Sequence, residues 1–241
     1  MSESDLVSVQ PAGGGLGLFA RVDLPAGSLV VSEPPLVQVT TPHSPATLAK
    51  FLAQLRSQVA ALEEDRRDLF FSLHIARPDL VTKDRGELRM MGIYQANSLT
   101  IREQDKLKGR ELGTGVFPLT SRINHSCSPN SLWSFTGGGQ CEVRCVKLVR
   151  AGEEITASYL PSPLLSRADR QRHLAARYNF SCTCQVCAAP PQAEWRPLIG
   201  PDPSRYCALI GPDPLGHKDT AQSTQSPMLE AFLAFRCVFM V

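Results

Sequence analysis

The seven residues Asn124-His125-Ser126-Cys127-Ser128-Pro129-Asn130 place amide, imidazole, thiol and turn-forming side chains next to one another. Asparagine bonds its own backbone and proline fixes φ, so Ser128-Pro129-Asn130 predicts a turn and the whole stretch a loop. So many polar groups gathered in one loop indicate a functional site.

The composition limits the classes of protein that are possible. A chain of 241 residues with 43% hydrophobic content buries a full core and has room for one large or two small domains. The formal net charge of +2 demands no nucleic-acid partner, and we expect none to bind directly. No uninterrupted apolar run reaches the roughly 18–20 residues that span a bilayer, so we expect no membrane segment.

The cysteines indicate a metal site. The first twenty residues lack a signal peptide, so we expect a cytoplasmic or nuclear protein whose eight cysteines stay reduced. Cys182, Cys184 and Cys187 supply three thiols for a tetrahedral zinc ion, and a fourth histidine or cysteine must come from elsewhere. Unliganded thiols are the alternative. Cys141 and Cys145 lie about 13 Å apart on one face of a predicted strand, so we expect them in the core.

Local patterns predict short strands with inserted helices. The strand segments are 7–9, 18–20, 29–31, 36–39 and 155–159, with a hairpin over 131–149. Ser44 and Pro45 predict the start of a helix whose apolar residues recur to position 62. Further helices are expected around 69–73, over 85–96 and from the capping residue Ser166 to about Arg177, while 113–118 predicts a turn. The fold class is therefore α+β, mainly β.

The central loop resembles the Asn-His-Ser-Cys-x-Pro-Asn signature of SET-domain protein lysine methyltransferases. Three further motifs match that family in order: Gly15-x-Gly17, the stretch from Gly152 to Tyr159, and the cysteine triplet of a post-SET segment. The resemblance covers about residues 6–188. It is closest to the SET-and-MYND subfamily, but residues 20–126 contain no cysteine, so the MYND zinc finger is missing.

The resemblance implies a SET fold of small twisted sheets with a knot-like crossing. The SET domain would occupy 6–160, with a helical insertion at about 44–96, and a post-SET helix and zinc-binding segment would occupy 161–188. Residues 189–241 carry the direct repeat Leu-Ile-Gly-Pro-Asp-Pro at 198–203 and 209–214. Their proline, glycine and polar residues predict a poorly ordered tail.

The family's activity implies S-adenosylmethionine as methyl donor and a histone or non-histone protein as the substrate that bears the target lysine. It implies that Tyr159 is catalytic and that Cys127 is the fourth ligand of a structural zinc beside Cys182, Cys184 and Cys187. It also implies cofactor contacts from Gly15, Leu16, Gly17, Asn97, Ser121, Arg122, Asn124, His125, Tyr159, Tyr178 and Phe180.

Each of these assignments has a structural alternative. The glycine turn also fits a plain hairpin, Asn97 a helix C-terminus, and Tyr159 a half-buried strand residue. The arginines of 166–177 fit a solvated face or a surface that attracts an acidic stretch of substrate. The basic residue near Gly14 and the polar residue near Leu16 that related proteins often carry are missing here. A catalytically silent SET-fold protein with an interaction or regulatory role is therefore the alternative to an enzyme.

Overall fold

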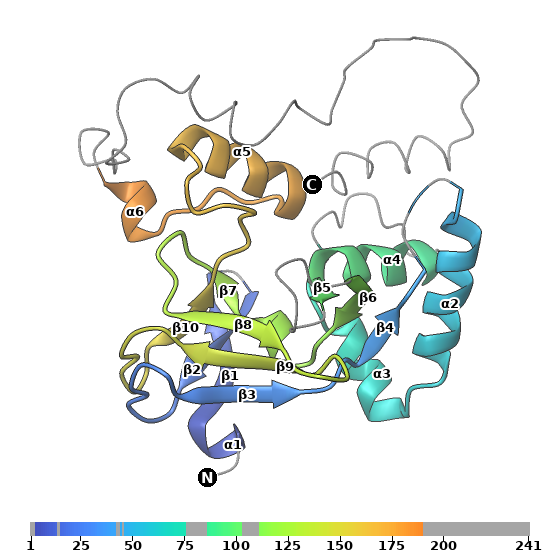
Figure 1. The fold of residues 1–241 in the computed structure, drawn as a ribbon, viewed down its shortest axis with the longest axis horizontal. Helices are drawn as coiled ribbons and strands as arrows, with labels where there is room; N and C mark the ends of the chain where they lie inside the picture. Colours follow the sequence, from blue (N-terminus) through green and yellow to red (C-terminus); the bar gives the residue numbers. More distant parts are fainter. Residues whose placement is uncertain are drawn as a thin grey trace. The chain divides into compact units, whose positions relative to one another are not determined.

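Three small β-sheets and a block of helices make up the computed structural model, which describes residues 3–13, 15–41, 44, 46–75, 86–102 and 111–189 (Figure 1). The predicted tail lies outside these residues apart from Ala189. The first sheet has the order β1-β2-β10-β7, the second β3-β9-β8 and the third β4-β6-β5. The prediction of a mainly β, α+β fold with inserted helices is confirmed.

The first sheet carries the functional loop. The hairpin of β1 (Val7–Ala12) and β2 (Gly15–Ala20) pairs Ala12 with Gly15, as the glycine turn predicts. β10 (Glu154–Ala157) lies antiparallel to β2 on one side and parallel to the short β7 (Asn124–His125) on the other. The central loop thus begins as a two-residue strand, and its parallel pairing brings two distant motifs together.

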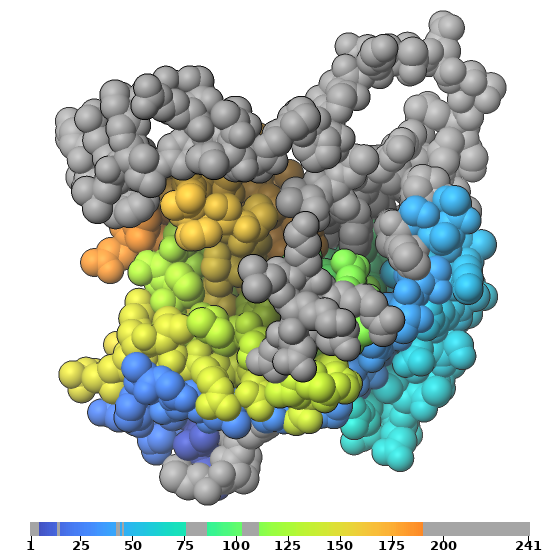
Figure 2. Space-filling model, in the orientation of Figure 1, coloured from blue at the N-terminus to red at the C-terminus, as the bar shows by residue number. Residues whose placement is uncertain are grey.

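The second sheet confirms the predicted hairpin at 131–149. It consists of β3 (Leu29–Glu33), β8 (Ser131–Phe135) and β9 (Cys141–Cys145). On the face shown in Figure 2, this sheet and the blue-to-cyan helical block occupy neighbouring parts of the surface. Cys141 and Cys145 are 0% and 2% exposed, which confirms that they are core residues.

The helical insertion packs on the third sheet, formed by β4 (Val37–Val39), β5 (Ser98–Arg102) and β6 (Glu111–Val116) (Figure 1). Its helices are α2 (Leu48–Ala60), α3 (Glu64–Phe71) and α4 (Gly86–Asn97). The predicted apolar stripe of α2 is buried at Phe51, Leu52, Leu55 and Val59. A common core with β4 and β6 holds the insertion against the rest of the domain.

Two predicted boundaries are wrong in this region. The helix begins at Leu48 rather than at Ser44, because Ser44 and Thr47 form a turn in which Thr47 N donates to Ser44 O at 3.1 Å. The predicted turn at 113–118 is mostly strand β6, the central strand of the third sheet. Gly113 instead lets the backbone of Val39 approach closely, and Gly115 leaves room for neighbouring side chains.

The last described elements are α5 (Arg167–Tyr178) and α6 (Gln185–Ala188). Ser166 caps α5 as predicted, since its Oγ accepts from Asp169 N at 3.2 Å. Strand β10 ends at Ala157, two residues earlier than predicted, so Tyr159 lies in the segment that leaves the sheet. Two very short helices, α1 (Glu3–Leu6) and the 3-10 turn η2 (Thr120–Arg122), complete the described elements. Within the described part of the chain, no helix combines the length and apolar character needed to cross a membrane.

Candidate active site and metal centre

Tyr159 lies at the centre of the site. Its hydroxyl donates to the carbonyl oxygen of Ile123 at 2.6 Å, and its ring centroid lies 4.8 Å from that of Tyr178 and 5.4 Å from that of His125. Burial, followed by the proximity of Tyr178 and Glu154, raises the pKa of Tyr159 above its ordinary value. The phenol therefore keeps its proton at neutral pH, and it can act as a hydrogen-bond donor but not as a strong general base.

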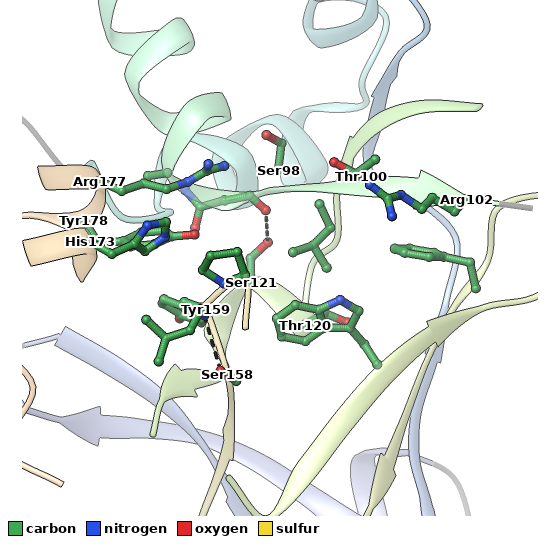
Figure 3. Close-up of a pocket in the computed structure, with 17 residues that line it drawn as sticks. Ser98, Thr100, Arg102, Thr120, Ser121, Ser158, Tyr159, His173, Arg177 and Tyr178 are labelled. Carbon is green, nitrogen blue, oxygen red and sulfur yellow. Dashed lines mark hydrogen bonds between the residues drawn. The ribbon is translucent and has the colours of Figure 1, made fainter. Parts of the chain in front are cut away.

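A cavity of about 530 Å³ opens beside Tyr159 (Figure 3). Four of the residues predicted to contact the cofactor line it: Asn97, Ser121, Tyr159 and Tyr178. Among the described residues, its lining contains three basic side chains and no carboxylate; the basic ones are Arg102, His173 and Arg177. Sequence reasoning missed these three. The cavity therefore has a positive electrostatic character, which disfavours an ammonium ion.

Asn97 is the helix C-terminus that one of its two predicted alternatives gives, and its contact with the cofactor stays a prediction. It is the last residue of α4, and its Nδ2 donates to the carbonyls of Ile93 at 2.7 Å and His74 at 2.8 Å. Its own carbonyl accepts from Ser121 Oγ at 3.4 Å (dashed in Figure 3). The residue thus ends the helix and fixes one wall of the cavity.

The other predicted cofactor residues do not line this cavity. Arg122 donates to Ser72 Oγ at 2.6 Å and to Ser72 O at 3.3 Å, so its guanidinium is engaged at the end of α3. The remaining ones lie in the central loop or beside it: Gly15, Leu16, Gly17, Asn124, His125 and Phe180. Tyr159 contacts both groups, since its ring lies against His125 on one side and the cavity on the other.

Asn124 connects the central loop to strand β2. Its Nδ2 donates to Glu154 Oε1 at 2.7 Å and to Leu16 O at 3.2 Å. Gly17 makes this close passage possible, because a Cβ there would lie 2.5 Å from Glu154 Oε1 and 3.0 Å from Asn124 Nδ2. Sequence reasoning missed Glu154 as a positioning residue, although it belongs to the Gly152 motif.

His125 joins the loop to Tyr159. Its Nδ1 accepts from the backbone N–H of Tyr159 at 3.0 Å, while its Nε2 lies 3.3 Å from Cys127 Sγ. Burial, with smaller contributions from Arg170 and His173, lowers the pKa of His125 to about 4. The imidazole is therefore neutral and links two neighbours by hydrogen bonds.

The four predicted sulfur ligands come together. The Sγ atoms of Cys127, Cys182, Cys184 and Cys187 all lie within 4.8 Å of one another, and Cys127 Sγ is 3.5 Å from Cys187 Sγ and 3.9 Å from Cys182 Sγ. Four sulfurs at the Zn–S distance of a tetrahedral site are about 3.8 Å apart. The group therefore fits a zinc ion without large rearrangement.

One of these thiols, that of Cys184, has a lowered pKa, which favours its thiolate form. Burial alone raises the pKa of Cys184, but the backbone N–H groups of Cys187 and Cys127 and other hydrogen bonds outweigh it, and the pKa falls to about 6. A thiolate is the form that binds a metal. The local backbone therefore favours metal binding at this position.

Arg170 contradicts the predicted solvated face of α5. Its side chain is buried, with 8% of the residue exposed, whereas Arg172 on the same helix is exposed. The Arg170 guanidinium faces the cysteine group, with Nη2 3.7 Å from Cys187 Sγ. A charge run on a helix predicts solvent exposure only where nothing packs against it, and here the zinc-binding segment does.

Comparison with known proteins agrees with this geometry. The family model described as the SET domain matches residues 15–160. Histone-lysine N-methyltransferase set5 of Schizosaccharomyces pombe is 30% identical over 188 residues, which cover 77% of this chain and 51% of that protein. N-lysine methyltransferase SMYD2-B of Danio rerio is 29% identical over 155 residues, 60% of this chain and 34% of its own length.

Protein-lysine N-methyltransferase SMYD4 of Mus musculus is 42% identical over 79 residues, 32% of this chain and 10% of that protein. This chain thus spans about half, or less, of the length of these curated relatives. The match to the family model covers more than half of the chain. From its central loop, its sheets and these matches, the chain belongs to the SET-domain family.

Proposed function

We propose that this chain is a protein-lysine methyltransferase that moves a methyl group from S-adenosylmethionine to a lysine side chain of a protein. The observation that carries the proposal is the parallel pairing of β7 with β10, which places Asn124 and His125 beside Tyr159 at the edge of the cavity. The names of the matched relatives support the same chemistry.

The residues around the loop suit the methyl donor. S-adenosylmethionine supplies a methyl group on a sulfonium, together with an adenine and an amino-acid end. Tyr178 and Phe180 offer aromatic faces for the adenine. Asn124 offers a polar side chain for the cofactor. The edge at Gly15 and Leu16 offers space, since a Cβ at Gly15 would meet no atom within 4 Å.

Tyr159 and the cavity then serve the incoming lysine. Methyl transfer needs a neutral amine held in line with the methyl group, and alignment of this kind can lower a barrier by roughly 7–11 kcal/mol. A protonated phenol at Tyr159 orients the reacting groups without taking the amine's proton. Like charges lower the pKa of a lysine, so Arg102 and Arg177 favour the neutral amine, and water accepts the proton.

A structural zinc at Cys127, Cys182, Cys184 and Cys187 forms part of the proposal. Its role is to tie the segment after α5, which carries Tyr178 and Phe180, to the central loop. Such a thiolate centre needs a reducing compartment, which agrees with the proposed cytoplasmic or nuclear location.

The test separates binding from transfer. Calorimetry with S-adenosylmethionine on zinc-replete protein is expected to show binding that Asn124→Ala abolishes. Tyr159→Phe is expected to keep that binding and to lose about 10²-fold or more in transfer of labelled methyl to a protein extract. Cooperative thermal unfolding of each of the three proteins, above the temperature of the assay, serves as the folding control. Well-folded protein that binds no S-adenosylmethionine would leave the silent interaction protein as the function.

A further inference from the structure

Arg170 is a buried cation for which no carboxylate partner exists among the described residues. Its Nη1 donates to Leu165 O at 2.9 Å, its Nη2 lies 3.7 Å from Cys187 Sγ, and its buried Nε has no hydrogen-bond partner. Removing a charge from water costs several kcal/mol unless an opposite charge compensates it. The structure must therefore supply an anion next to this guanidinium.

Among the residues that the structure describes, the cysteine group is the one source of negative charge that Arg170 contacts. Four neutral thiols would leave the guanidinium uncompensated. Four thiolates around one Zn²⁺ carry a net charge of about −2, which the guanidinium reduces to about −1. Charge-assisted N–H···S contact of this kind is also stronger than contact to a neutral thiol.

A second N–H group, that of His125 on β7, faces one of the four sulfurs. His125 Nδ1 accepts from the backbone N–H of Tyr159, so the proton of the neutral ring is on Nε2, and that N–H faces Cys127 Sγ at 3.3 Å. A thiolate accepts such a bond far better than a thiol does. Donors from α5 and from β7 thus both indicate anionic sulfur.

We propose that Arg170 is the counter-ion of the four-cysteine centre, a positioning residue whose charge strengthens zinc binding and slows zinc release. The inference rests on the zinc of the proposed function and adds a residue outside the ligand set. It makes Arg170 part of the metal centre rather than part of a surface that attracts substrate.

Three variants of full-length, zinc-loaded protein test the role of charge. Arg170→Met keeps an apolar stem and removes the charge, and Arg170→Lys keeps the charge without the planar fork. Arg172→Met is the matched control on the same helix, since Arg172 is exposed and pairs with Asp169 at 2.8 Å. Zinc affinity is measured by competition with a chromophoric chelator, and zinc release by the rate of colour formation.

We expect Arg170→Met to weaken zinc binding about 10–100-fold, as loss of an outer-shell contact does. Arg170→Lys should lose clearly less affinity than Arg170→Met, because the charge remains although the two contacts of the guanidinium fork do not. Arg172→Met should change zinc binding by less than about twofold, because exposed ion pairs contribute little.

Two results overturn the proposal. Arg170→Met could bind zinc as wild type does, or Arg170→Lys could lose as much affinity as Arg170→Met, which would make packing and not charge the cause. If Arg170→Met does not fold, Arg170→Gln takes its place as the uncharged variant, and the same comparison with Arg170→Lys decides the matter. Wild-type protein that takes up no zinc overturns this inference and the zinc proposal together, while S-adenosylmethionine calorimetry still judges the methyltransferase proposal separately.

Discussion

Gly17→Ala should damage the site through a clash whose partners are known. A Cβ at position 17 would lie 2.9 Å from Ala12 Cβ across the hairpin and 2.5 Å from Glu154 Oε1. The Glu154 side chain can rotate away, but it then gives up its 2.7 Å bond from Asn124 Nδ2. The methyl of Ala12 cannot rotate, so the strands must separate. Such overpacking costs about 1–3 kcal/mol.

The size of the effect follows from these contacts. Each kcal/mol lowers the melting temperature of a domain of this size by about 2–4 °C. Loss of the charged hydrogen bond that holds Asn124 is worth about 1.5 kcal/mol. We therefore expect the affinity for S-adenosylmethionine to fall about tenfold.

Gly15→Ala is the matched control for Gly17→Ala. Position 15 lies on the same face of β2, two residues earlier, and a Cβ there would meet no atom within 4 Å. This variant should melt at the wild-type temperature or slightly above it, since alanine restricts the unfolded chain. Scanning calorimetry measures the stability of both variants, and ligand titration measures the affinity of Gly17→Ala. If Gly17→Ala and Gly15→Ala melt alike, the explanation from the clash is wrong.

Two further changes test the scaffold around the site. Glu33 is buried and accepts from Thr120 N at 2.7 Å and Thr120 Oγ1 at 2.8 Å, so Glu33→Gln, which places an amide against these donors, should cost about 1–3 kcal/mol. An unchanged urea midpoint would contradict this. Ser166→Ala removes the cap of α5 and should cost about 0.5–2 kcal/mol in thermal unfolding. The hydrogen bond from Ser166 is the main reason that the pKa of Asp169 is lowered, so the variant should also raise that pKa in an NMR titration, and an unmoved titration would refute it.

Signals that lie within a few residues of one another were sufficient to predict much of the fold. The Ser166 cap, the hairpin at 131–149 and the helical stripe of α2 follow from local spacing, and the structure confirms them. Gly113 was wrongly assigned to a turn. It has φ of 122°, and a Cβ there would lie 2.4 Å from Val39 O, so glycine is required by a neighbouring strand that the local sequence does not reveal.

The candidate site likewise has a part that could be predicted from the sequence and a part that depends on how distant elements pack. The resemblance to the SET family was enough to group Cys127 with the cysteine triplet, and the sulfur atoms do lie together. The bond of Glu154 to Asn124 and the burial of Arg170 were missed, because both depend on how separate elements pack. A single sequence shows the spacing of residues along the chain, but it does not show which elements pack together and therefore which arginine is buried.

The strand order β1-β2-β10-β7 has a consequence for how the site can be divided. Strand β10 lies between partners from the start and the middle of the chain, with Ile155 beside Leu18 and Thr156 beside Asn124. No contiguous fragment that lacks any one of these segments contains the complete sheet that precedes Tyr159. The site is therefore indivisible along the chain: truncation that reaches β2 from one side or β10 from the other removes part of it, and only the joined segments, covalent or reassembled, can recreate it.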